Sequence, residues 1–105
     1  MTLTEATFDE TLATTDELLL VDFWAPWCGP CRAVAPVLES LVNERADQVK
    51  LAKVNVDEEP GLAGRYAIRS IPTILLVKGG RIVDTVIGAV PRATLEAKIA
   101  KALGS

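Results

Sequence analysis

Histidine is absent from this chain of 105 residues, and cysteine occurs only at Cys28 and Cys31. A structural zinc site takes four ligands, usually cysteine or histidine, so one copy of the chain cannot supply them, although two copies could share an ion between four cysteines. No apolar run approaches the roughly 20 residues of a membrane-spanning helix. No basic cluster is present to bind a phosphate backbone. We therefore expect neither a membrane protein nor a nucleic-acid-binding protein.

The charge balance is slightly acidic and the composition is that of a folded domain. Eleven lysines and arginines stand against fourteen acidic residues, which gives a net charge of -3, and half of the residues are hydrophobic. We expect a single globular domain over residues 1–105. Residues 1–5 carry neither a basic flank nor an apolar stretch, so no signal peptide is expected and we predict a cytoplasmic protein.

Both cysteines and both tryptophans fall within eight residues, Trp24-Ala25-Pro26-Trp27-Cys28-Gly29-Pro30-Cys31. A purely structural disulfide is a poor explanation for cysteines three residues apart, because so small a loop removes little entropy from the unfolded chain. Reducing compartments also keep such cysteines in the thiol form. Both arguments favour a redox function for the two cysteines.

Hydrophobic spacing predicts strands that alternate with helices. Thr7 to Glu10 resembles a capping box at the start of a short helix. Leu18 to Trp24 is apolar on both faces, as in a strand at the centre of a sheet. An amphipathic helix follows the cysteines to about Arg45, and Pro36 should kink it. The later elements are a strand over 49–56, a short helix over 60–66, a hairpin of strands 73–78 and 81–87 around two glycines, and a helix over 91–103.

This order predicts an α/β fold with a small mixed sheet. Strands separated by helices run parallel with crossover connections, and the terminal hairpin adds an antiparallel edge. In such sheets, sites form beyond the carboxyl ends of the strands. Cys28 and Cys31 directly follow the strand that ends at Trp24, so their position agrees with a functional site.

Together with the eight residues around the cysteines, five further features resemble the thioredoxin family over essentially the whole chain: Asp22, Pro36, Lys53-Val54-Asn55-Val56-Asp57, Arg69-Ser70-Ile71-Pro72-Thr73 and Gly88. The resemblance implies the thioredoxin fold, a central mixed sheet of four to five strands flanked by four helices, with a short strand near Thr2 to Thr4. It also implies a general protein disulfide reductase that works by dithiol–disulfide exchange. Its redox centre would be a Cys28–Cys31 disulfide with no bound cofactor or metal. Disulfide-containing client proteins and a thioredoxin reductase that passes on electrons from NADPH would be its partners, and we expect a monomer.

The two cysteines have different predicted roles. Cys28 should lie at the N-terminal end of a helix, where free backbone N–H groups and the helix dipole favour an anion, so its thiol should ionise easily and act as the nucleophile. Cys31 lies one helical turn later and deeper, and is the predicted resolving thiol. Between them, Pro30 has a fixed φ and no N–H to leave unpaired, and Gly29 lets the turn close and leaves the sulfurs unshielded. In the family this Gly-Pro pair is associated with a reducing potential.

Asp22 and Lys53 are the predicted proton-transfer residues. The neighbours of Asp22 on both strand faces are apolar, and burial would raise its pKa enough to exchange a proton with Cys31. The alternative is that Asp22 lies at the end of the strand and is partly exposed to water. Lys53 could belong to an ordinary solvated face, but the resemblance makes it the residue that modulates Asp22.

The resemblance also implies a cis peptide bond before Pro72 and an apolar docking surface around Cys28. Sequence statistics alone would predict a trans bond. The docking residues would be Trp27, Val56, Ile71, Pro72, Ile87, Gly88 and Ala89, with Trp24 in the core beneath. Ser70 and Pro26 depart from residues that some members carry, glycine and an acidic residue, so surface contacts could differ there.

Two other functional classes stay open at this point. A thiol oxidase or isomerase would use the same cysteines with a less reducing pair, although such proteins often carry a histidine before the second cysteine. A non-catalytic subunit would use the fold as a binding module and would keep its partner without either cysteine.

Overall fold

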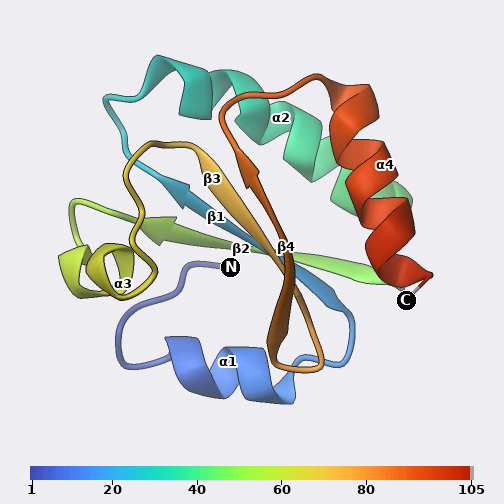
Figure 1. Cartoon of the computed structure of the whole chain (residues 1–105), viewed down its shortest axis with the longest axis horizontal. Coiled ribbons are helices and arrows are strands. Elements are labelled where there is room, and N and C mark those ends of the chain that lie inside the picture. Colours follow the sequence, from blue (N-terminus) through green and yellow to red (C-terminus); the bar gives the residue numbers. More distant parts are fainter. Residues whose placement is uncertain (105) are drawn as a thin grey trace.

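A single sheet with the strand order β2-β1-β3-β4 organises the chain (Figure 1). The computed structural model describes residues 1–104. The strands are β1 (Leu18–Trp24), β2 (Val49–Asn55), β3 (Thr73–Lys78) and β4 (Arg81–Ile87). The predicted central position of β1 is confirmed, because β1 pairs with β2 on one side and with β3 on the other.

The fifth strand expected near the N-terminus is reduced to one bridge. Thr2 pairs with Lys53 of β2 in parallel orientation. The backbone N–H of Leu3 donates to the carbonyl of Lys53 at 2.8 Å. The first three residues therefore cover part of the outer edge of β2 without forming a longer strand.

The direction of β3 differs from the prediction. β1 and β2 are parallel, but β3 runs antiparallel to β1, with Thr73 opposite Phe23 and Val77 opposite Leu19. The intervening helix α3 (Pro60–Arg65) is six residues long and stays near the carboxyl end of β2, so it does not run back along the sheet as a crossover helix would (Figure 1). The chain therefore re-enters the sheet at the end where β1 stops.

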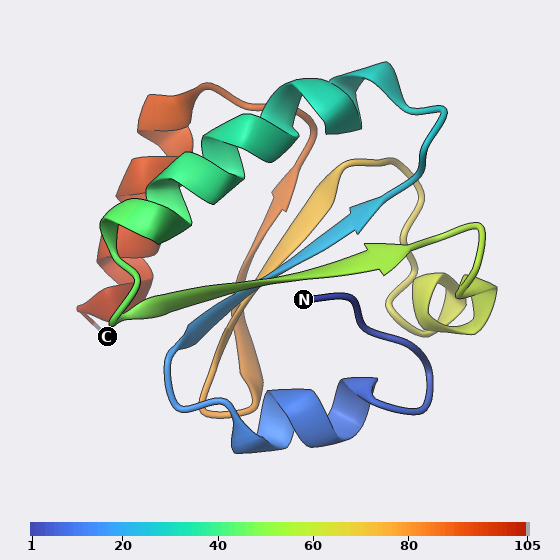
Figure 2. The ribbon, with the colours of Figure 1, turned by 180° about the vertical axis from the view of Figure 1, so that it is seen from behind.

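The remaining helices cover the two faces of the sheet. α2 (Gly29–Glu44) and α4 (Arg92–Leu103) lie over one face, and α1 (Phe8–Thr14) lies with α3 on the other side (Figures 1 and 2). Alternate residues of β1 supply both cores: Leu18 and Leu20 pack with α2 and α4, whereas Leu19, Val21 and Phe23 pack with α1 and α3. The family's four-helix architecture is thus present.

One local expectation is corrected, and another stays open. Thr7 precedes α1 but its side chain does not cap the helix. Its φ of -107° and ψ of -12° are already close to helical, and its Oγ1 instead accepts a hydrogen bond from the N–H of Thr4 at 3.0 Å. α2 continues from Gly29 to Glu44 through an exposed Pro36, so the proline does not end the helix, and the kink expected there stays a prediction.

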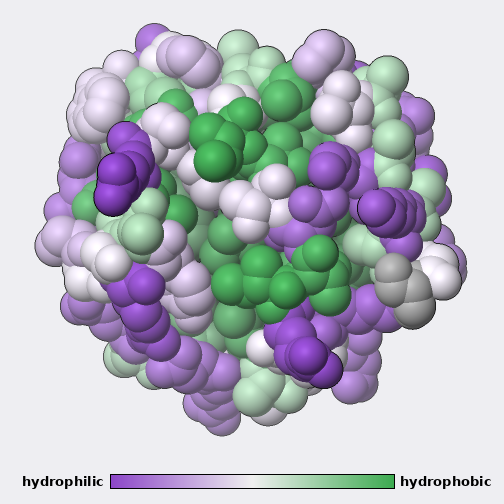
Figure 3. All heavy atoms as spheres, in the orientation of Figure 1, coloured by the Kyte–Doolittle hydropathy of each residue, from purple (hydrophilic) through white to green (hydrophobic). Residues whose placement is uncertain are grey.

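The predicted hairpin of β3 and β4 is confirmed. Gly79 and Gly80 have φ values of 60° and 77°, the left-handed conformation that a tight two-residue turn requires. The pairing shifts by one residue between Leu76 and Val77, which marks a β-bulge. Apolar surface gathers over β4 (Figure 3), where Ile82, Val83 and Ile87 are exposed. No helix within residues 1–104 has the length and hydrophobicity needed to cross a membrane.

Candidate redox site

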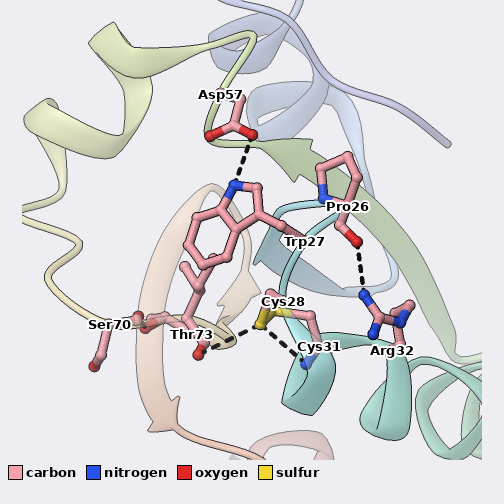
Figure 4. Close-up of a disulfide and its surroundings, with 9 residues drawn as sticks. Pro26, Trp27, Cys28, Cys31, Arg32, Asp57, Ser70 and Thr73 are labelled. Carbon is pink, nitrogen blue, oxygen red and sulfur yellow. Dashed lines mark hydrogen bonds between the residues drawn. A yellow bond between two sulfur atoms is a disulfide. The ribbon is translucent and has the colours of Figure 1, made fainter.

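The cysteine pair lies at the N-terminus of α2, just beyond the carboxyl end of β1 (Figure 4). Cys28 is the N-cap residue of α2, and Gly29 and Pro30 form the start of the helix. Pro30 costs no hydrogen bond there, since the first backbone N–H groups of a helix have no partner within it. Cys28 and Cys31 form a disulfide with their Cα atoms 5.2 Å apart.

The helix terminus supplies a hydrogen bond to the first sulfur. The backbone N–H of Cys31 donates to Cys28 Sγ at 3.1 Å. In the reduced protein this donor and the positive end of the helix dipole would stabilise a thiolate at Cys28. The geometry agrees with the assignment of Cys28 as the residue that ionises first.

The sulfurs are less open than the presence of Gly29 suggested. Cys28 exposes 4% of its surface and Cys31 exposes 2%. Gly29 is itself exposed, but Trp24, Val56 and Ile71 pack against the pair. An attacking partner must therefore approach Cys28 through a narrow opening, and the two thiols differ little in depth.

Asp22 lies in β1 on the face covered by α2, with 1% of its surface exposed. Its Oδ1 has no hydrogen-bond partner in the described chain. Burial raises the pKa of Asp22 from an ordinary value of 3.8 to about 6, and the positive charge of Lys53 partly opposes this rise. The alternative of a partly wet strand end is excluded for Asp22.

Lys53 occupies the position next to Asp22 on β2, where the two residues are directly paired. Its Nζ lies 3.6 Å from Glu39 Oε1 and 5.8 Å from the centre of the Trp24 ring. The ammonium group is thus shared between a carboxylate of α2 and an aromatic face, and Lys53 does more than line a solvated surface. Glu39 was not anticipated from the sequence.

The loop before β3 reaches the cysteines from a distant part of the sequence. The Ile71–Pro72 peptide bond is cis, as the resemblance implied. Cys28 Sγ lies 3.8 Å from the carbonyl oxygen of Ile71, and the carbonyl of Pro72 accepts a hydrogen bond from the N–H of Gly88 at 2.8 Å. The antiparallel direction of β3 brings this loop to the carboxyl end of β1.

A groove of about 420 Å³ opens beside the cysteine pair. We call it the site groove. The residues that line it are Trp27, Val56, Ala63, Ile68, Arg69, Ser70 and Ile71. Trp27 is 68% exposed, and its Nε1 donates a hydrogen bond to Asp57 Oδ2 at 2.8 Å (Figure 4). The indole of Trp27 therefore forms one wall of the groove, and the carboxylate of Asp57 holds it in place.

The structure does not place all seven predicted docking residues in this groove. Trp27, Val56 and Ile71 line it, whereas Ile87 lines a neighbouring groove. Pro72 is buried, and Ala89 is exposed just after Gly88, beyond the end of β4. Trp24 packs against the cysteines as expected, but it is only half-buried and not fully within the core.

Several contributors were missed by the sequence reasoning. Ile68 lines the site groove although it lies in an irregular segment between α3 and β3, which no periodicity marks, and Arg69 beside it appears in the sequence only as part of a family motif. Asp57 was noted only as part of a motif, and nothing in its spacing from Trp27 reveals their hydrogen bond. No cluster of three or more His, Cys, Asp or Glu residues in the described part of the chain could hold a metal ion.

Comparison with known proteins agrees with this geometry. The family model described as thioredoxin matches residues 1–101. Thioredoxin 1 of Synechococcus elongatus is 55% identical over 92 residues, which cover 88% of this chain and 86% of that protein. The thioredoxin of Porphyra purpurea is 50% identical and covers 93% of this chain and 92% of its own length. The chloroplastic M-type thioredoxin of Pisum sativum is also 50% identical, over 92% of this chain and 56% of its own length.

Proposed function

Because the chain belongs to the thioredoxin family and carries its active-site cysteine pair, it is a thiol–disulfide oxidoreductase, and we propose that it reduces disulfide bonds in client proteins and keeps their thiols reduced. The observation that carries this proposal is the Cys28–Cys31 pair at the N-terminus of α2, with a hydrogen-bond donor 3.1 Å from Cys28 Sγ. We place this activity in the cytoplasm and in a monomer.

In the proposed reaction, electrons move between sulfur atoms only. In the reduced protein, the Cys28 thiolate attacks one sulfur of a client disulfide, so a Cys28–client bond forms while the client disulfide breaks and one client thiolate leaves. Cys31 then loses its proton and attacks Cys28 Sγ. The Cys28–Cys31 bond forms, the second client thiolate leaves, and two electrons have passed to the client. A thioredoxin reductase supplied with NADPH would return two electrons to the pair.

Asp22 is the group proposed to receive the proton of Cys31. A pKa of about 6 leaves the carboxylate available near neutral pH while keeping it basic enough to accept a proton. Lys53 would hold this pKa below the value that burial alone would give. Gly29 and Pro30 would tune the potential through the shape of the helix start, and the site groove would hold the client beside Cys28.

The role of each cysteine can be tested by trapping. We expect Cys31→Ser to accumulate a covalent complex with a disulfide-containing client, because the Cys28–client bond then has no resolving thiol. Non-reducing electrophoresis and mass spectrometry would identify this complex. Cys28→Ser is the matched control and should form none. If Cys31→Ser turned over normally, the assignment of Cys31 as the resolving thiol would be wrong.

The direction of electron flow needs a separate measurement. We expect a strongly reducing potential when the protein is equilibrated with glutathione buffers, and turnover of a model protein disulfide when NADPH and a thioredoxin reductase are supplied. A potential well above that of the glutathione pool would favour an oxidase or isomerase instead.

A further inference from the structure

A second groove continues from the site groove toward the edge of the sheet. It has a volume of about 240 Å³, and we call it the β4 groove. Its lining residues are Tyr66, Ala67, Ile68, Arg69, Ser70, Thr73, Leu75, Ile82, Thr85 and Ile87. The two grooves share Ile68, Arg69 and Ser70. A client segment that enters at Cys28 therefore meets a continuous surface across this shared loop and on to the apolar surface over β4 (Figure 3).

Arg69 is the one charged residue among the described side chains that line either groove. Its guanidinium has no ion pair or hydrogen bond within residues 1–104, and the side chain is exposed. Two other arginines form ion pairs: Arg65 binds Asp9, and Arg92 binds Glu44 and Glu96. An unpartnered cation in a mostly apolar groove of an acidic protein is suited to recognise a negative charge brought by a partner.

We propose that Arg69 selects client segments that carry an aspartate or glutamate two to four residues from the attacked cysteine. This inference rests on the proposed function, since it names a preference of the same exchange reaction. Arg69 precedes Ile71 by two residues, a span of at most about 7 Å. The Ile71 carbonyl lies 3.8 Å from Cys28 Sγ. An extended client advances about 3.3 Å per residue, so a side chain two to four residues away meets the guanidinium.

The chemistry of the pair supports the preference. A guanidinium presents a planar set of donors that matches a carboxylate in a two-bond arrangement. The half-buried Ile68 excludes part of the water beside Arg69 and strengthens the attraction relative to bulk solvent. A client lysine at the same place would be repelled. The charge of Arg69 therefore discriminates between otherwise similar clients.

The test uses peptides whose single cysteine is linked by a disulfide to thionitrobenzoate. Cys28 of the reduced protein attacks the peptide sulfur and releases the coloured thiolate, whose absorbance gives a second-order rate constant. Matched peptides carry Glu, Gln or Lys three residues before or after the cysteine. We expect the Glu peptide of one series to react about two- to fivefold faster than its Gln counterpart at low salt, and high salt to reduce this ratio.

Three variants separate an effect of the Arg69 side chain from an effect of the protein's net charge. Arg69→Gln should bring the Glu-to-Gln ratio to about one, whereas Arg69→Lys should keep part of it. Arg81→Gln is the matched control, because Arg81 is exposed and lines neither groove, yet the change in net charge is the same. The proposal is overturned if Arg69→Gln and Arg81→Gln give the same ratio. Failure of the unsubstituted protein to release thionitrobenzoate from any peptide would instead contradict the proposed function.

Discussion

At the scale of single residues, Trp27 combines strong exposure with a fixed orientation. An exposed indole would ordinarily sample several rotamers. Here its Nε1 donates to Asp57 at 2.8 Å, so the ring is held as a wall of the site groove. A wall that is already in place reduces the entropy lost when a client segment binds.

We expect Asp57→Ala to lower kcat/KM for a protein client by about two- to fivefold, because the indole loses its charged acceptor and its orientation. In NMR spectra the Nε1–H resonance of Trp27 should shift, whereas that of Trp24, whose Nε1 is buried, should change little. Glu58→Ala is the matched control, since it removes the same charge from the neighbouring exposed position. Equal effects of the two substitutions on kcat/KM would contradict a role of the hydrogen bond.

At the scale of elements, the β3–β4 turn depends on two glycines in the left-handed region. Residues with a Cβ atom pay roughly 1–2 kcal/mol there. Gly64, in the last turn of α3, has no such φ and open space around its Cα. Helix propensity alone would favour alanine at that position by about 1 kcal/mol.

We therefore expect opposite results from one substitution at two glycines. Gly80→Ala should lower the free energy of unfolding by about 1–2 kcal/mol, while Gly64→Ala should leave it unchanged or raise it by up to about 1 kcal/mol. Urea denaturation of both variants measures the difference. A destabilised Gly64→Ala would show that α3 tolerates less change at its end than the open space suggests.

The elements themselves were predictable because each carries its own pattern of apolar spacing. The strands, the helices and the glycine turn all follow from residues close together in the sequence. The direction of β3 does not, since a strand after a helix can enter a sheet from either end. The direction of β3 depends on the short α3, which does not run back along the sheet, and the local spacing of apolar residues does not show this. The side chain of Thr7 failed as a cap for a similar reason, because the backbone of Thr4 competes for its oxygen.

The site was predictable in its chemistry but less so in its surroundings. Cys28, Cys31 and the burial of Asp22 follow from the motif and from the apolar neighbours of Asp22. The cis bond before Pro72 came from the resemblance alone. The contacts of Trp27 with Asp57 and of Lys53 with Glu39 join separate elements, so only the folded chain reveals them.

At the scale of the whole molecule, Asp22 links global stability to pH. Its pKa is about 6 in the folded protein and about 3.8 when unfolded. Between these values the folded state binds more protons than the unfolded state, so the free energy of unfolding falls as pH rises from about 4 to about 6. The full loss amounts to about 3 kcal/mol and persists at higher pH.

We expect Asp22→Ala to be more stable than the unsubstituted protein at pH 7, by about 1–3 kcal/mol, and to show a smaller loss of stability between pH 4 and pH 7. It should also slow the resolving step. Urea denaturation at the two pH values, together with the decay rate of the mixed disulfide, would measure both effects. Asp16→Ala is a control for an exposed aspartate. Unchanged or lower stability of Asp22→Ala at pH 7 would argue against a costly buried carboxyl.

The two edges of the sheet differ in how they could meet a second copy of the chain. Residues 1–3 cover part of the β2 edge, whereas β4 pairs on one side only within the described chain. An open edge with exposed Ile82 and Val83 is a template for aggregation. The bulge in β4, where Val83 is the extra residue between Ile82 and Asp84, and the charges of Arg81 and Asp84 interrupt a flat, apolar row, which makes register with another strand harder to achieve. The irregular hairpin therefore disfavours edge-to-edge pairing between copies of the chain.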